Sequence, residues 1–369
     1  MPTPSRAEST VTPLAPLTTL RLGGPARRLV RATTEAELID AVTALDAAGE
    51  PLLLLAGGSN VVIADAGFDG TVVHIATTGI ARDGNVLDVQ AGEPWDGVVA
   101  HAGALGLAGI EALSGIPGSA GATPIQNVGA YGQDVSQTIV SVRVLDRASG
   151  EVAELSADDC GFRYRTSAFK GRDDRVVLSV RFGLAEGGAG EQGASARTGE
   201  PGASALGAPV AYAELARTLG VEVGARASLA EVRGAVLALR RGKGMVVDPA
   251  DPDSVSAGSF FTNPILDPDA YAALAVRAEA SGAPAPPAFP EPDGRVKTSA
   301  AWLIQHTGFT RGLTSGNVAI SSKHTLALVN RGGASTAELV AFAREIAAGV
   351  EQAFGVALVP EPVFVGHRW

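Results

Sequence analysis

Cysteine is almost absent from this chain of 369 residues, which contains a single one. One thiol excludes a disulfide framework and a metal cage built from cysteines, so we predict a protein of a reducing compartment. Positive charge is also scarce, with 29 Lys+Arg against 39 Asp+Glu and a formal net charge of −10. Because phosphate contacts need clustered cations, this balance argues against a general nucleic-acid-binding protein.

Long apolar runs are missing as well. The run from Leu52 to Ala56 is strand-length and far below the ~20 residues that span a bilayer. The first twenty residues contain four prolines and no apolar signal-peptide region. We therefore expect a soluble, cytoplasmic protein with no membrane partner. With 46% hydrophobic and 18% charged residues the composition is globular. The length favours two or three domains.

Helix and strand patterns alternate in the first part of the chain. Thr34 and Glu37 form a capping box that predicts a helix ending near Gly49. A helix is also predicted from Pro94, and Gly84 marks a hairpin turn. The expected strands are 52–55, 61–63, 71–75 and 139–144.

The second half contains one stretch that resists a structural assignment. Residues 186–208 include seven glycines and almost nothing larger than alanine, so we expect a disordered surface insertion there. Beyond it, helices are predicted at 228–240 (capped by Ser228 and Glu231), 268–280, near 298–306, and after the capping box of Ser335 and Glu338; residues 356–365 form a strand-like tail.

Glycine-rich segments carry the clearest ligand signals. Gly57, Gly58, Ser59 and Asn60 directly follow a predicted strand, where exposed N–H groups and missing Cβ atoms suit a diphosphate. An ordinary glycine turn explains this segment alone equally well. Residues 115–132 form neither a good helix nor a good strand, yet are not linker-like. This pattern favours a planar apolar ligand held by main-chain amides over a rigid inter-domain loop.

Four further segments are notable, although each has a simple structural explanation. Residues 162–170 mix three cations with three aromatics, and residues 257–264 place a hydroxyl among glycine and phenylalanines. A solvated patch and a core strand would account for them. A favourable interaction with a helix dipole would explain residues 240–243, and a solvent-facing edge position would explain Glu361. Hydrolase and metal motifs are absent and the histidines are scattered, so no metal is expected.

Taken in order, these segments are similar to those of the UDP-N-acetylenolpyruvoylglucosamine reductase (MurB) family. The resemblance runs from about residue 18 to 366. It is carried by AGGSN at 56–60, GIPGSAGATPIQNVGAYG at 115–132, YRTSAFK at 164–170, AGSFFTNP at 257–264 and the tail PEPVFVG. The family is one of flavoenzymes of peptidoglycan precursor synthesis.

The resemblance implies an α+β fold: a pair of FAD-binding subdomains of the vanillyl-alcohol-oxidase type plus a smaller α/β substrate-binding domain. The implied division is residues 1–80 joined by the tail 356–369, residues 81–242, and residues 243–355. It also implies non-covalent FAD, NADPH as co-substrate, and a monomer acting on small molecules. The implied activity is that of a UDP-N-acetylmuramate dehydrogenase.

The family's functional positions map onto this chain residue by residue. The implied catalytic residues are Arg165, Ser259 and Glu361. The implied cofactor-binding residues are Gly57, Gly58, Ser59, Asn60, Gly115, Ile116, Pro117, Gly118, Gly121, Ala122, Thr123 and Ile125. The implied substrate-binding residues are Tyr131, Tyr164, Tyr212, Lys243, Asn263 and Gln305, with Tyr212 indicating the type that has a tyrosine loop.

The implied reaction fits these residue types. Hydride passes from NADPH to the flavin and then to C3 of UDP-N-acetylglucosamine enolpyruvate, and C2 is protonated. A permanently charged guanidinium at Arg165 suits the negative charge that develops on the substrate carboxylate. Ser259 is the implied proton donor. Glu361 is implied either to relay that proton or to stabilise the enol form, and the sequence leaves both roles open.

Two departures and two rival functions remain in view. Pro362 and Val363 differ from the family's usual residues after the tail glutamate, which leaves the tail contacts open. A sugar or alcohol oxidase of the same flavin fold is one rival, since such enzymes often bind flavin through a His or Cys. Cys160 and His74 are available in this chain, although neither lies inside the flavin motifs. A flavin- or nucleotide-binding protein without turnover is the other.

Overall fold

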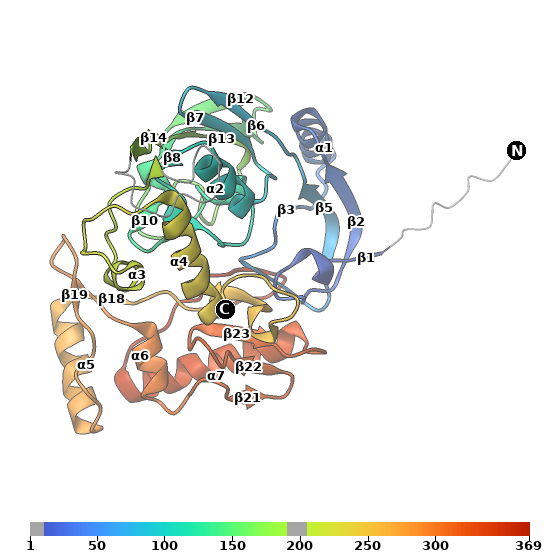
Figure 1. Cartoon of the computed structure of the whole chain (residues 1–369). Coiled ribbons are helices and arrows are strands. Elements are labelled where there is room, and N and C mark those ends of the chain that lie inside the picture. Colours follow the sequence, from blue (N-terminus) through green and yellow to red (C-terminus); the bar gives the residue numbers. More distant parts are fainter. Residues whose placement is uncertain (1–10, 190–204) are drawn as a thin grey trace, which may run out of the picture. The chain divides into compact units, whose positions relative to one another are not determined.

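The computed structural model describes residues 11–189 and 205–369 (Figure 1). The chain divides into two compact units. The first contains residues up to Thr12, 26–57 and 69–242, and the second contains 13–25, 58–68 and 243–369. Within the described ranges, every helix is too short or too polar to cross a membrane.

An antiparallel sheet forms the centre of the first unit. Its five strands lie in the order β12-β11-β13-β7-β6. Their bounds are β6 (Ile80–Asp83), β7 (Val86–Gln90), β11 (Ile139–Asp146), β12 (Val152–Ser156) and β13 (Arg175–Gly183). The predicted hairpin is confirmed, because Asp83 pairs with Val86 across the two-residue turn of Gly84 and Asn85. Helix α2 (Trp95–Ala104) begins after Pro94 as predicted, and Trp95 is buried against Phe182.

A second sheet has the order β1-β2-β5-β3. It comprises β1 (Thr12–Pro13), β2 (Pro25–Ala32), β3 (Leu52–Leu55) and β5 (Phe68–Ile75), with β3 and β5 parallel. Helix α1 (Glu35–Ala47) starts at the predicted capping box of Thr34 and Glu37. Its buried face packs against residues of this sheet such as Val73.

Short elements complete the first unit around the glycine-rich segment. They are β8 (Leu107–Ala108), η2 (Glu111–Leu113), η3 (Ala120–Ala122), β9 (Gly129–Ala130), β10 (Gln133–Asp134), η4 (Val135–Gln137), α3 (Ala213–Leu219) and α4 (Leu229–Gly242). The capping box of Ser228 and Glu231 is present at the start of α4.

The expectation of disorder throughout 186–208 is wrong at both ends of that range. Strand β14 (Ala185–Glu186) pairs with β8, and β15 (Gly188–Ala189) pairs with β16 (Ala205–Leu206). Backbone pairing needs no large side chains, so the composition argument does not apply to these short strands. Residues 190–204, the rest of the expected insertion, lie outside the described residues.

The second unit is built on the antiparallel sheet β17-β23-β22-β21. Its strands are β17 (Ser256–Ser259), β21 (Thr314–Ser315), β22 (Val318–Ile320) and β23 (Ala327–Asn330). A smaller sheet contains β18 (Ile265–Leu266), β19 (Phe289–Pro290) and β20 (Val296–Lys297), and η1 (Ala15–Leu17) and η5 (Pro252–Ser254) are single turns.

Three helices surround these strands, drawn in orange to red in Figure 1: α5 (Pro268–Ala280), α6 (Ala300–Gln305) and α7 (Thr336–Phe354). The apolar face of α7, including Leu339, Ile346 and Val350, is buried in the core of this unit. The predicted tail is strand only in β24 (Val363–Val365), which pairs in parallel with β4 (Val61–Ile63).

The capping box of α7 gives a stability prediction. The Ser335 hydroxyl accepts a hydrogen bond from Glu338 N at 3.1 Å, and Ser335 N donates to Glu338 Oε2 at 2.7 Å. We expect Ser335→Ala to lower the free energy of unfolding by about 1 kcal/mol, because it removes the hydroxyl acceptor. Ser335→Thr keeps that acceptor and is the matched control in denaturant titration. Equal stability of all three proteins would contradict the prediction.

Candidate functional site

Arg165 lies at the tip of a tight turn in the first unit. Arg163 N donates to Thr166 O at 3.0 Å, and Thr166 N donates back to Arg163 O at 3.2 Å. Between them Arg165 has φ +52°, a left-handed conformation that turns normally give to glycine or asparagine. An arginine there costs roughly 1–2 kcal/mol of backbone strain. Strain of this kind clusters at functional sites, which supports a role for the Arg165 side chain.

The tip of a second hairpin approaches that arginine. Strands β9 and β10 are joined by Tyr131 and Gly132, which both have positive φ, at 51° and 86°. Arg165 Nη2 donates to Gly129 O in β9 at 2.9 Å. The Tyr131 ring meets Tyr212 edge to face, with centroids 5.6 Å apart. The structure therefore brings together Arg165, Tyr131 and Tyr212, which the sequence analysis predicted as site residues in three separate segments.

Two glycine segments meet through their backbones in the same unit. A Cβ placed on Gly57 would lie 2.7 Å from Gly118 Cα, so position 57 does not tolerate a side chain at this contact. Next to it, the Ser119 hydroxyl is buried and has no hydrogen-bond partner among the described residues. Buried hydroxyls are nearly always bonded, so this one calls for a ligand. An unpartnered hydroxyl at a backbone-lined surface fits a flavin cofactor with its diphosphate.

The glycine-rich segment is fastened by a charged pair. Asp96 accepts a hydrogen bond from Gly115 N at 2.6 Å and a bidentate pair from Arg233 at 2.6 and 2.9 Å. Burial raises the pKa of this carboxyl, but the bonds from Arg233 and Gly115 and the charge of Arg240 outweigh it and leave the pKa lowered. Asp96 therefore stays ionised and ties the start of the segment to α4.

Arg240 at the other end of α4 is a second cation near Arg165. Burial lowers the pKa of its guanidinium to about 10, Tyr131 and Asp96 favour its charge, and Arg165 opposes it. This partly buried charge raises the local positive potential around Tyr131 and Arg165. That environment suits an anionic substrate group. Tyr164 is exposed, with the Arg165 guanidinium carbon 5.8 Å from the centre of its ring.

In the second unit, a β-bulge sets the position of Ser259. Ser256 pairs with Val329 and Ser259 with Ala327, so β17 carries one extra residue relative to β23. Gly258 within the bulge has φ +75°. Bulges re-aim side chains beside active sites. The half-buried Ser259 side chain at the end of β17 is placed by this irregularity.

The tail residue Glu361 lies beside this strand. Glu361 N donates to Phe260 O at 2.9 Å. The side-chain Nδ2 of Asn60 donates to Glu361 O at 3.3 Å, and the main-chain carbonyl oxygen of Asn60 accepts from Val363 N at 2.9 Å. Asn60 therefore binds the tail on both sides of Pro362. The structure thus brings Asn60, Ser259 and Glu361 together in one unit. The unusual Pro362 and Val363 sit in this pairing without breaking it.

Four other predicted residues lie in the second unit: Gly58, Asn263, Gln305 and Lys243. A Cβ on Gly58 would lie 1.9 Å from Leu17 O. The Asn263 side chain accepts from Ala300 N at 3.0 Å and so caps α6. Gln305 Nε2 donates to Thr325 Oγ1 at 2.8 Å. Lys243 begins the C-terminal part of the second unit and is half-buried.

Gln305 lines an open cavity of ≈ 550 Å³ together with Thr310, Arg311 and Ser322. Arg311 places an exposed cation in this cavity, which suits an anionic group of a ligand. The sequence analysis selected neither Arg311 nor Ser119. Ser119 lies inside the glycine-rich segment, whose glycines are its visible signal, whereas no sequence signal marks Arg311.

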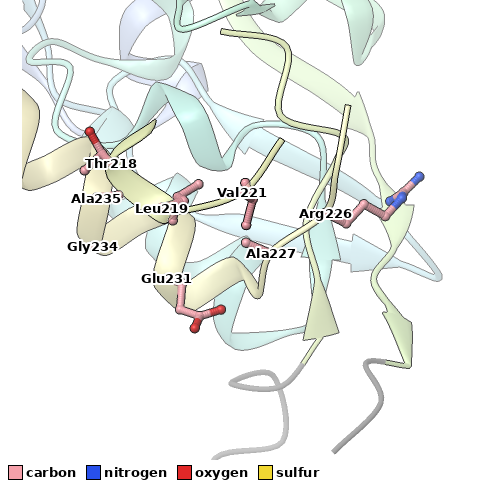
Figure 2. A pocket seen from close by; sticks show the side chains of 8 residues that line it. All are labelled: Thr218, Leu219, Val221, Arg226, Ala227, Glu231, Gly234 and Ala235. Atoms are coloured by element: carbon pink, nitrogen blue, oxygen red, sulfur yellow. The ribbon is translucent and has the colours of Figure 1, made fainter. Parts of the chain in front are cut away.

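A second cavity, of ≈ 540 Å³, lies between α3 and α4 and contains none of the predicted residues. Its polar side chains are already engaged: Arg226 donates to Gly207 O, and Glu231 accepts from Ser228. Figure 2 shows that the ends of Arg226 and Glu231 lie apart and do not converge on the cavity. Ligand sites need convergent polar groups, so this cavity is not the candidate site.

The predicted site residues are divided between the two units. Arg165 and the segment 115–125 belong to the first unit, and Ser259 and Glu361 belong to the second. Within the described ranges, no group of three or more His, Cys, Asp or Glu could hold a metal ion.

Two family models match the chain. Residues 26–156 match an FAD binding domain, and residues 249–365 match the C-terminal domain of UDP-N-acetylenolpyruvoylglucosamine reductase. The expected FAD-binding module followed by a distinct C-terminal domain is thereby confirmed.

Curated relatives match along nearly the whole chain. A UDP-N-acetylenolpyruvoylglucosamine reductase of Streptomyces coelicolor is 58% identical over 96% of this chain and 89% of its own length. The reductase of Thermobifida fusca is 55% identical over 96% of this chain and 97% of its own length. The crystal structure of the reductase from Thermus caldophilus has a TM-score of 0.63, with 24% identity over 95% of this chain and 97% of that one. That structural likeness shows the fold.

The Asp96 anchor gives a prediction with a defined pH dependence. We expect Asp96→Asn to weaken cofactor retention, because Arg233 loses its charged partner. The lowered pKa means that ionised Asp96 stabilises the fold above its unfolded pKa of about 3.9, and this contribution is lost as the pH falls through the folded pKa. The stability gap between wild type and Asp96→Asn in urea titrations should therefore close below about pH 4. A gap independent of pH would contradict it.

Proposed function

The chain belongs to the UDP-N-acetylenolpyruvoylglucosamine reductase family, and from this premise we propose how its own residues carry out the reaction. It is an FAD-dependent oxidoreductase that reduces UDP-N-acetylglucosamine enolpyruvate to UDP-N-acetylmuramate in peptidoglycan precursor synthesis, with NADPH as co-substrate. The observation that carries the residue assignment is that Arg165 and Ser259 are both held by irregular backbone, a strained turn and a bulge.

Bound FAD would supply hydride transfer between NADPH and C3 of the enol ether. The backbone of Gly57 and Gly118 and the Ser119 hydroxyl are the groups of the first unit best suited to hold its diphosphate. Asp96 keeps this surface in place by binding Gly115 N. The rest of the predicted set in 115–125 would line the same ligand.

Arg165 binds the substrate carboxylate, onto which negative charge moves as C3 is reduced. Its strained turn and its bond to Gly129 O fix the guanidinium before substrate arrives, so little reorganisation is needed during the reaction. The buried charge of Arg240 adds to the positive potential on this side. The aromatic rings of Tyr131, Tyr164 and Tyr212 supply the surface on which the nucleotide sugar packs.

Ser259 gives the proton to C2, and Glu361 supplies or replaces that proton. A serine hydroxyl is a weak acid, so it needs a partner that can carry a proton. The main-chain pairing of Glu361 with Phe260 and Asn60 places this residue beside the Ser259 strand, which favours a relay over a distant electrostatic role. Lys243, Asn263, Gln305 and Arg311 complete the proposed contacts to the diphosphate and sugar.

The broader expectations belong to the same proposal. We infer a monomer in the cytoplasm, where UDP-sugar precursors and NADPH are available. We also retain the three-part division at residues 80 and 242, with the tail as a returning segment. The parallel pairing of β24 with β4 supports that return.

Flavin spectroscopy tests the reaction directly. We expect the purified protein to show an oxidised flavin band that NADPH bleaches anaerobically and that returns only after UDP-N-acetylglucosamine enolpyruvate is added. If oxygen alone reoxidises the flavin, at a rate that the sugar does not change, the result would favour the rival assignment as a sugar or alcohol oxidase. A protein that takes up no FAD would remove the flavoenzyme assignment altogether.

Ser259→Ala tests the proton donor. We expect it to slow reoxidation of the flavin by the sugar by about 10²–10⁴-fold, because C2 loses its acid. Reduction by NADPH should stay within about twofold, since no proton reaches C2 in that half-reaction. Stopped-flow absorbance measures both rates. Unchanged turnover would show that Ser259 is not the donor and leave room for a binding protein or another acid.

Arg165→Gly tests whether the strained turn serves the side chain. Glycine adopts the turn without strain, so stability should stay within about 1 kcal/mol of wild type. Reoxidation by the sugar should fall by at least about 10²-fold, because the carboxylate loses its guanidinium. Arg165→Lys keeps a charge and should be less impaired. A glycine variant with full activity would refute the assignment.

Cys160 separates the reductase from oxidases with attached flavin. This thiol is fully buried, and burial raises its pKa to about 11, so it is a poor nucleophile. We expect all FAD to appear in the supernatant after the protein is denatured and precipitated. Yellow colour retained in the washed precipitate would indicate a covalent bond and contradict this.

A further inference from the structure

Four aromatic rings form a continuous cluster in the second unit. Trp369 lies 5.8 Å from Phe261, 5.8 Å from Phe364 and 6.4 Å from Phe260, measured between ring centroids. Phe260 is in turn 5.2 Å from Phe261 and 6.2 Å from Phe364. Trp369 contacts the other three members, as Phe260 does, and so links the phenylalanines of both segments.

The phenylalanines of this cluster belong to the two segments that carry Ser259 and Glu361. Phe260 directly follows Ser259, and its carbonyl accepts the hydrogen bond from Glu361 N at 2.9 Å. Thr262 N donates to Val359 O at 3.0 Å, and Phe261 forms a bridge with Pro360. Two proposed catalytic side chains therefore rest on one short backbone ladder, with the aromatic cluster packed on it.

The ladder is short, so its geometry depends on what packs against it. The bulge in β17 already interrupts regular pairing with β23 at Ser259. Phe260 N still donates to Leu326 O at 2.7 Å on one side, and the tail holds the other side. A ring that spans Phe260, Phe261 and Phe364 restrains both segments against sliding.

Burial separates Trp369 from its partners. Phe260 and Phe261 are 1% exposed and fill the core, whereas Trp369 is 43% exposed. A half-exposed ring contributes less to folding than a core residue, so its contact with both segments needs another explanation. The backbone beside it is fixed as well, because Arg344 Nη2 in α7 donates to Arg368 O.

We propose that Trp369 is a positioning residue for the reaction: its ring braces the strand after Ser259 and the tail after Glu361, and so holds the two side chains in register with each other. This inference rests on the proposed function of those two residues. It predicts that loss of the ring affects proton delivery to the substrate and spares hydride uptake from NADPH, which uses neither side chain.

The experiment compares half-reactions in Trp369→Ala, Trp369→Phe and the control Trp302→Ala. We expect Trp369→Ala to slow flavin reoxidation at saturating sugar by roughly 10–100-fold, since small misplacements of reacting groups cost that much. Flavin reduction by NADPH should stay within about twofold, and Trp369→Phe should recover most of the loss. Trp302 packs on His306 and Phe354 instead, so its truncation lowers stability without slowing that step.

The outcomes separate the alternatives. Two results would contradict the proposed positioning role of Trp369: equal slowing of both half-reactions by Trp369→Ala, and the same selective slowing by Trp302→Ala. In either case the effect would be a general loss of structure. Unchanged reoxidation in a folded Trp369→Ala protein would also contradict that role. Failure of the proposed function appears differently, as wild-type flavin that the sugar does not reoxidise.

Discussion

The pairing of the tail with two distant segments is the constraint on which the second unit depends. Asn60 bonds to residues about three hundred positions away, at Glu361 and Val363, and Phe260 accepts from Glu361 N. These few backbone bonds join a glycine turn near the start of the chain, the bulged strand and the tail. These bonds hold the tail in one register and place Glu361 beside Phe260, the residue after Ser259.

The first unit solves a related problem by strain instead of pairing. Arg165 and Tyr131 both occupy left-handed conformations that disfavour their side chains, and Asp96 holds the glycine-rich segment through a charged bidentate contact. Such strain persists only where the surroundings impose it. The rigid features of this unit therefore lie at the residues proposed to meet its ligands, next to the ring pair of Tyr131 and Tyr212.

The two units also differ in how they use aromatic residues. Tyr164 and Tyr212 are exposed and available to a ligand, whereas Phe260, Phe261 and Phe364 pack behind the residues proposed to react. Trp369 extends that packing to the surface.

The sequence by itself determined the local elements and the identity of the family. Capping boxes at Thr34 and Ser335 and the Gly84 turn act through neighbouring residues, so their outcome could be predicted from spacing alone. The motifs implied Arg165, Ser259 and Glu361. Only the tertiary structure decided four features: the bulge before Ser259, the two hydrogen bonds between Asn60 and the tail, the unpartnered Ser119 hydroxyl and the contacts of Trp369. These depend mostly on segments that are far apart in the sequence, and no local pattern encodes which groups will meet.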